Sequence, residues 1–406
     1  MTLAATAAKS VHDERRDGTV TVGLVVLSQV AHFLTYAAIP LFLPLIRQDL
    51  GISFTQAGAL SAAGLLTYAL AQIPAGYLSD RIGPRRLFFA GLLGWSALCL
   101  GFALSGAYGA ALAILLVAGF FRALLFAPGL SLLASWFPPQ RRATAMSLLL
   151  LGATTGSVVL ALAGPRLAAL HGWRATLVAF AVIGIAIACL FGALASDQPK
   201  AAAREPLTLH DALRIARIPI LWVCNGLQAV RFAVSMGFGF WLPSFLIADR
   251  GLSVAAAGTV MAASAAIAAP SYTLGAYVSD RLKNPPLVIG GALAALAVAA
   301  LALPAAESMW QIFLVVAAYS VFQGFYFGPL FMVPVEVLGP RYTGVATGFG
   351  NLFANMGGFI SVYALGVIRD GTGSFRWGFT AISAACVAGV LLAVLLSRLR
   401  NRSLAA

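Results

Sequence analysis

Residues 77–81 read YLSDR and residues 277–281 read YVSDR, and each stretch ends a long apolar segment. The spacing between them is about 200 residues, and other pairs of stretches repeat it in the same order. Together these pairs indicate that the chain contains two copies of one unit. The other pairs are QVAHF (29–33) with QAVRF (228–232), DLGIS (49–53) with DRGLS (249–253), and FRALLFAP (121–128) with FQGFYFGP (322–329).

Long apolar segments recur along the whole chain of 406 residues, which is 61% hydrophobic and only 10% charged. A water-soluble protein carries charge on about a quarter of its residues. An apolar helix of about 20 residues crosses the ~30 Å hydrocarbon core of a bilayer, and runs this long do not fit the strands of a membrane barrel. We predict twelve transmembrane segments: 20–46, 54–78, 86–105, 108–135, 143–169, 173–195, 218–248, 254–279, 286–304, 309–335, 343–368 and 375–397.

The repeat and the segments together predict an all-α integral membrane protein with twelve transmembrane helices. We expect two pseudo-symmetric six-helix bundles around a central cavity, 1–195 and 218–406, joined by a cytoplasmic linker at 196–217. That linker is the longest polar connection in the chain, and it falls between segments six and seven. Parallel repeats of this kind leave a cavity between them, and substrate sites lie near its midplane.

The net charge of +13 is explained by membrane topology rather than by nucleic-acid binding. If the N-terminus is cytoplasmic, cytoplasmic connections hold 18 of the 26 Lys and Arg residues and external connections hold six. Membrane proteins concentrate positive charge on the cytoplasmic side in this way. We therefore expect both termini in the cytoplasm, a multi-pass protein in the cytoplasmic (inner) membrane of a bacterium, and membrane lipids as its surroundings.

Arg122 and Arg231 lie near the middle of apolar segments, whereas all 13 acidic residues lie in polar connections or at segment ends. A guanidinium at bilayer depth costs about 2.5–3.5 kcal/mol on insertion scales, so a retained one indicates function. Its paired N–H groups match the geometry of a carboxylate. The two arginines therefore predict a site for a small anion. The alternative is a structural role, in which each bonds backbone carbonyls at a helix break, such as those that Pro128–Gly129 or Gly237–Gly239 would provide.

The repeat aligns other polar side chains with these arginines. His32 corresponds to Arg231 on segments one and seven, and Gln323 corresponds to Arg122 on segments ten and four. We predict that all four converge on one level of the cavity, with Tyr36 and Tyr326 as further substrate contacts. His32 is the one histidine in an apolar segment, so it is the candidate for proton coupling, although a packing role is the alternative.

The remaining small residues predict packing rather than chemistry. The four cysteines lack metal-ligand spacing, so we expect no metal and no cofactor. Glycines in segments five and eleven have the spacing that lets membrane helices approach closely and slide. They are Gly152, Gly156, Gly348, Gly357 and Gly358.

The stretch GYLSDRIGPRR (76–86) resembles the G-x-x-x-D-R-x-G-R-R/K signature of the major facilitator superfamily, with Pro84 as an extra element. The resemblance covers essentially the whole sequence. It implies that segments one, four, seven and ten line the central cavity, and that the signature aspartate forms a latch when the cytoplasmic side is closed. The gating residues that it implies are Asp80, Arg81, Arg141, Asp280, Arg281, Glu336 and Arg341.

A narrower resemblance concerns residues 122–145, which are similar to the anion:cation symporter branch, with an arginine in segment four followed by W-F-P-x-x-x-R. Residues 350–358 are faintly similar to nitrate transporters, but the arginines that those carry on segments two and eight are missing. A proton-coupled drug exporter would need an acidic residue at depth, and the sequence has none. A membrane enzyme or sensor would need a catalytic cluster, which the apolar segments also lack.

We therefore expect a secondary active transporter, not an enzyme, that moves a small organic anion such as a mono- or dicarboxylate by alternating access. Its partners are the anion and either protons or a counter-anion, because the residues fit both symport and exchange. We expect a monomer. A transporter of nitrate or nitrite, or a drug exporter, is the alternative.

Overall fold

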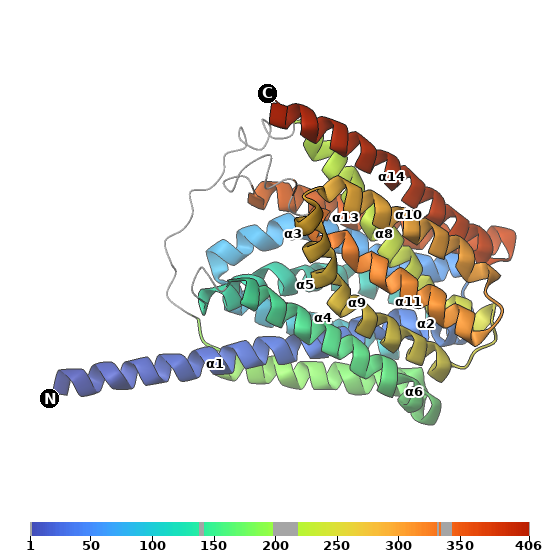
Figure 1. Ribbon diagram of the computed structural model, residues 1–406. Coiled ribbons are helices and arrows are strands. Elements are labelled where there is room, and N and C mark those ends of the chain that lie inside the picture. The colour runs from blue at the N-terminus through green and yellow to red at the C-terminus, as the bar shows by residue number, and fades with distance from the viewer. Residues whose placement is uncertain (1, 138–141, 198–217, 331–332, 334–342, 406) are drawn as a thin grey trace. The chain divides into compact units, whose positions relative to one another are not determined.

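The computed structural model describes residues 2–137, 142–197, 218–330, 333 and 343–405 (Figure 1). These residues form helices and short connections, and no strand occurs among them. Each of the twelve predicted segments overlaps a helix or one arm of a helix, and the first overlaps two consecutive helices. The prediction of an all-α membrane protein is therefore confirmed.

The described chain packs as two compact units, which we treat separately. Unit 1 comprises Met1–Ala38 and Leu70–Arg204, and unit 2 comprises Ile39–Ala69 and Glu205–Ala406. Residues 39–69 thus pack with helices of the second sequence repeat. Most of the predicted linker lies outside the described residues, and the predicted division into two six-helix bundles stays a prediction.

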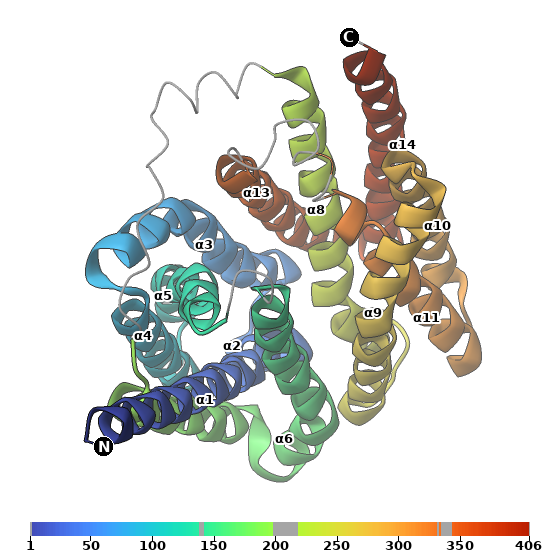
Figure 2. The same cartoon turned by 60° about the vertical axis from the view of Figure 1, so that its left-hand side comes forward.

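Unit 1 is a helix bundle in which α1 packs along α6, and α4 contacts both α5 and α6 (Figure 2). The two arms of α6 account for predicted segments five and six. They meet at Gly172, whose φ of 81° and ψ of 159° turn the chain back on itself, and a positive φ is readily adopted by glycine. The helices are α1 (Thr2–Tyr36), the second half of α3 (Phe54–Ile82), α4 (Pro84–Leu104), α5 (Tyr108–Ser135) and α6 (Arg142–Leu194).

In unit 2, α8 packs against α13 and α14, while α10 contacts α14 and α11, and α11 also contacts α9 (Figure 1). Local signals fix the helix starts. For example, Ser308 and Gln311 form a reciprocal capping box at the start of α11. The elements are α2 (Ala38–Leu50), the first half of α3, α8 (Pro219–Ala248), α9 (Val254–Leu282), α10 (Pro285–Ala302), the 3-10 turn η2 (Leu303–Ala305), α11 (Met309–Phe325), α13 (Thr343–Thr372) and α14 (Phe375–Ala405).

The first predicted segment is broken at Ala37, between α1 and α2. The break follows from Pro40, which has no N–H to donate to the carbonyl of Tyr36. The amide of Ala37 still bonds the carbonyl of Phe33 at 3.0 Å, so α1 ends with a complete turn. The break places Tyr36 at the end of a helix. The chain passes from unit 1 to unit 2 shortly afterwards, between Ala38 and Ile39.

Each unit has its own aromatic core. In unit 1 the rings of Phe88 and Phe191 lie 5.0 Å apart between centroids, and both side chains are fully buried. In unit 2 the rings of Phe238 and Tyr319 stack at 3.6 Å, and the hydroxyl of Tyr319 donates to the carbonyl of Val234. The Phe88 ring also packs against Gly129 on α5. These cores therefore hold α5 and α11 against their neighbours, and both helices carry predicted site residues.

Two glycine contacts confirm the internal repeat in three dimensions. A Cβ added at Gly156 on α6 would meet the backbone oxygen of Val30 on α1, and one added at Gly357 on α13 would meet that of Ala229 on α8. Val30 and Ala229 are equivalent in the sequence repeat. Gly152 and Gly358 also lie in close contact, as predicted. A Cβ at Gly348 would meet no described atom within 4 Å, so a close approach there stays a prediction.

We predict that Gly156→Ala lowers the melting temperature of the purified protein in detergent by several degrees. The new methyl forces α1 and α6 apart, and overpacking of this kind costs about 1–3 kcal/mol. The matched control is Gly23→Ala on α1, where the added carbon meets nothing within 4 Å. Since alanine is the better helix former by about 0.5–1 kcal/mol, this control should unfold at the same or a higher temperature. Equal melting temperatures for Gly156→Ala and wild type would contradict the close contact.

Candidate functional site

Arg122 lies on α5 and is half-buried. Its guanidinium carbon lies 4.0 Å from the centroid of the Tyr36 ring, at the end of α1. A guanidinium over an aromatic face gains a cation–π attraction that grows as water is removed. The break after Tyr36 thus positions an aromatic ring under the predicted anion-binding arginine.

His32 lies one turn before Tyr36 on α1 and is buried. Its ring stacks on Tyr36, with centroids 5.9 Å apart and planes 22° apart, and meets Trp95 edge-on at 5.2 Å. Neither ring nitrogen has a hydrogen-bond partner among the described residues. Buried polar atoms are nearly always paired, so a histidine left without a partner needs an explanation.

Arg231 lies on α8, where it is half-buried. Its Nε donates to Oε1 of Gln228, one turn earlier on the same helix, at 2.8 Å. The guanidinium carbon also lies 5.1 Å from the centroid of the Phe327 ring. These contacts orient the guanidinium through an amide oxygen and an aromatic ring, both of which are neutral.

Gln323 on α11 and Tyr326 directly after it both contact α8, the helix that carries Arg231. Nε2 of Gln323 donates to Oγ of Ser235, one turn beyond Arg231. The hydroxyl of Tyr326, which is buried, donates to the backbone carbonyl of Arg231 at 3.4 Å. Tyr326 thus fixes the helix that carries Arg231, and its predicted direct contact with substrate stays a prediction.

The structure brings the predicted residues together within each unit. His32 and Arg122 share the Tyr36 ring in unit 1, and Arg231 and Gln323 bond neighbouring turns of α8 in unit 2. The predicted convergence of all four on one level of a cavity stays a prediction.

The sequence reading missed several polar side chains on α8. Asn225, Gln228, Arg231 and Ser235 follow one another at intervals of three or four residues, which places them along one side of the helix. Gln228 and Asn225 are both nine-tenths buried or more, and the Nδ2 of Asn225 has no partner among the described residues. Helical spacing would have revealed this polar stripe.

One further residue near Arg231 had no signal in the sequence. The ring of Tyr272 on α9 lies 5.2 Å from that of Phe327, which in turn lies 5.1 Å from the guanidinium carbon of Arg231. The tyrosine lies on a helix that the repeat does not assign to the cavity, so only the packing of α9 against α11 identifies it.

The predicted gating residues are only partly described. The guanidinium of Arg81 lies 4.9 Å from the Tyr77 ring on α3, and that of Arg281 lies 5.6 Å from the Tyr277 ring on α9. The two copies of the motif therefore share one local geometry, and Asp280 beside it is exposed. The side chain of Asp80, together with Arg141, Glu336 and Arg341, lies outside the described part of the chain, so the cytoplasmic latch stays a prediction.

Comparisons with known proteins agree with this architecture. The family model described as Major Facilitator Superfamily matches residues 25–362. A hexuronate transporter of Bacillus subtilis is 25% identical over 87% of this chain and 88% of its own length, and a D-galactonate transporter of Escherichia coli is 24% identical over 86% and 89%. A nitrite extrusion protein of Bacillus subtilis is 23% identical over 92% and 93%.

The fold also matches a solved structure. A bacterial homolog to the human lysosomal transporter Spinster, crystallised in an inward-facing and unoccupied conformation, has a TM-score of 0.77 and 20% identity, with 95% of this chain and 97% of that chain covered. The chain is therefore a member of the major facilitator superfamily, a multi-pass membrane transport protein and not an enzyme.

Proposed function

We propose that the protein is a secondary active transporter that moves an organic anion, a hydroxylated carboxylate, across the cytoplasmic membrane of a bacterium by alternating access. The observation that carries this proposal is the kind of side chain that contacts Arg122 and Arg231, which lie near the middle of apolar segments. The Tyr36 ring and the Gln228 amide hold them without adding negative charge. We expect each guanidinium to bind a carboxylate through its paired N–H groups.

The substrate class has further support from the polar groups around Arg231. Amides and hydroxyls such as Gln228, Gln323, Ser235 and Tyr272 suit the hydroxyl groups of a sugar acid, because each can donate or accept a hydrogen bond. Relatives named as hexuronate, D-galactonate and galactarate/D-glucarate transporters are consistent with this class.

A second candidate is an inorganic anion such as nitrite. The nitrite extrusion protein among the relatives favours it, with matching coverage of 92% of this chain. A thermal-shift comparison of D-galactonate, D-glucarate, lactate, nitrite and nitrate separates the two candidates, since a ligand of the folded state raises the melting temperature. A shift with nitrite and none with the sugar acids would favour the inorganic anion.

We also propose His32 as the group that couples transport to protons. Its ring shares Tyr36 with Arg122, so a proton on His32 and an anion near Arg122 would act on the same aromatic contact. Exchange of one anion for another needs no such group, and symport and exchange therefore remain alternatives within the proposal.

We predict that Arg122→Lys or Arg231→Lys lowers galactonate uptake into proteoliposomes by ten- to a hundredfold at subsaturating substrate. Lysine keeps the charge but loses the paired N–H geometry, and hydrogen bonds to charged groups contribute about 1.5–3 kcal/mol. Arg376→Lys is the matched control, because this arginine is exposed at the start of α14. Wild-type uptake by both mid-segment variants would contradict the site.

We also predict that a negative charge at position 228 weakens substrate binding. Gln228→Glu keeps an oxygen that can accept from Arg231, so the fold should melt as in wild type, but the carboxylate neutralises the guanidinium. Opposite charges at 4 Å attract by about 4 kcal/mol at an effective dielectric near 20, so substrate competes poorly and its KM should rise at least tenfold. Gln228→Leu, which leaves the charge available, should raise KM less. The reverse order of the two variants would argue against Arg231 as an anion site.

We predict that His32→Gln abolishes the stimulation of uptake by an imposed pH gradient while anion exchange between equal pools continues. Glutamine retains polar atoms but does not titrate between pH 5 and 8, where histidine does. The measurement compares uptake with and without an inward proton gradient in both proteins. An unchanged gradient dependence in the variant would exclude His32 as the coupling group.

A further inference from the structure

Two aspartates each contact the N-terminus of a helix other than their own. Asp370, at the end of α13, accepts hydrogen bonds from the backbone amides of Phe54 at 3.0 Å and Thr55 at 2.6 Å, in the first turn of α3. These partners are more than 300 positions away in the sequence. Amides at a helix start lack acceptors within the helix, and the dipole there favours a negative charge.

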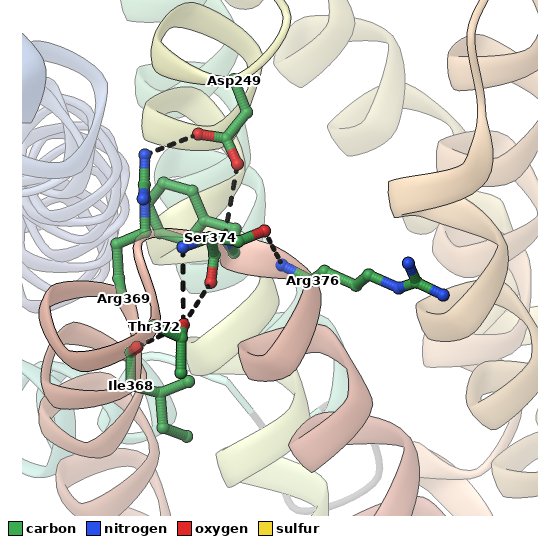
Figure 3. Close-up of polar contacts among 7 residues, drawn as sticks. Asp249, Ile368, Arg369, Thr372, Ser374 and Arg376 are labelled. Atoms are coloured by element: carbon green, nitrogen blue, oxygen red, sulfur yellow. Dashed lines mark hydrogen bonds and ion pairs between the residues drawn. The ribbon is translucent and has the colours of Figure 1, made fainter.

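Asp249, at the end of α8, makes the corresponding contact with α14. One carboxylate oxygen pairs with Nη2 of Arg369 at 2.9 Å, and the other accepts from the amide of Phe375 at 3.3 Å (Figure 3). Arg369 immediately precedes Asp370 on α13. The two aspartates therefore connect four helices, α3, α8, α13 and α14, at one point.

Both helix starts also have caps of their own. Ser53 accepts from the amide of Gln56, whose side chain accepts in turn from the amide of Ser53. At α14, the Oγ of Ser374 accepts from the amide of Arg376 (Figure 3). Because these local caps do not involve Asp370 or Asp249, we expect α3 and α14 to stay folded when the distant contacts break. This redundancy is what a reversible contact requires.

Aromatic and cationic groups complete the cluster. The Phe54 ring lies against the rings of Trp241 and Phe375, with centroids 6.0 Å and 5.4 Å away. The guanidinium carbons of Arg47 and Arg369 lie 4.0 Å and 5.0 Å from the same ring. The side chains of Arg369 and Asp249 are 15% and 20% exposed, so water reaches the ion pair.

We propose that Asp370 and Asp249, with their amide and arginine partners, form a latch that opens and closes in each transport cycle. The positive-inside topology places it on the outer face, and the inference rests on that topology and on the transport proposed above. Opening releases the start of α3, which belongs to the first sequence repeat, from helices of the second repeat. Closing restores the contacts of the two carboxylates with the starts of α3 and α14, which stay helical throughout.

The first experiment measures opening without any substrate. Ala57 on α3 is fully buried one turn beyond Phe54, and Ala57→Cys supplies a thiol that a membrane-impermeant maleimide reaches only when the latch opens. The native chain gives the background from its own cysteines. Adding Asp370→Ala should increase the labelling rate at least threefold from the outside in right-side-out vesicles. Glu307→Ala is the control, since it removes an exposed carboxylate of the α10–α11 connection, which the topology places on the same face.

Unchanged labelling in Asp370→Ala and in Asp249→Ala, or labelling only in inside-out vesicles, would overturn the proposal. Circular dichroism decides whether α3 has unfolded, and lost helicity would also overturn it, because the local cap would then be insufficient.

The second experiment locks the latch. A disulfide between Thr55→Cys and Asp370→Cys should reduce galactonate uptake at least tenfold, and a reductant should restore it. Uptake at the wild-type rate with the disulfide formed would refute the latch. A protein that transports no carboxylate at all would fail the proposed function, while the labelling result would still test the latch.

Discussion

The hydrocarbon core of the bilayer solvates neither backbone amides nor charges, and this constraint decides most of the structure. Helices satisfy the amides within each segment. In the sequence the charged residues lie in polar connections or at segment ends, apart from Arg122 and Arg231 near the middle of apolar segments. Both are held by side chains with no charge of their own, a tyrosine ring and a glutamine amide. A guanidinium retained at membrane depth indicates a function, and the anion site proposed above rests on these two arginines.

The two repeats share their close backbone contacts but differ in their polar side chains. The contacts of Gly156 with Val30 and of Gly357 with Ala229 occur at equivalent positions, because any side chain there would separate the helices. The polar positions differ between the repeats: a histidine in one copy is an arginine in the other, and an arginine is replaced by Gln323. Steric exclusion leaves only glycine possible at these close contacts, whereas the polar positions are free to differ between the repeats.

The sequence predicted those features that depend on composition and local spacing. Apolar length located the segments, the repeat paired the helices, and glycine spacing anticipated the close approach at Gly156. The partner of Arg231 could also have been predicted from the sequence, because Gln228 lies one helical turn away. The contact between Asp370 and Phe54 could not be predicted, because no pattern relates a carboxylate at one helix end to amides more than 300 residues earlier. Tyr272 likewise required the packing of α9 against α11.

The absence of acidic residues from the middle of the apolar segments also constrains the energetics of transport. The apolar segments hold no carboxylate that could carry a proton together with the substrate, so a monoanion carried alone moves one negative charge through the membrane. A potential of 100 mV, negative inside, opposes the entry of that charge by about 2.3 kcal/mol. Entry with one proton is electrically neutral, and exchange of one monoanion for another is neutral as well. A dianion needs two protons or a dianionic partner. Uptake of an anion against this potential therefore requires coupling or a concentration gradient large enough to overcome it. A group that couples protons to uptake must titrate within the membrane or travel with the substrate. Among the side chains within the apolar segments, His32 is the ordinary candidate for the first route.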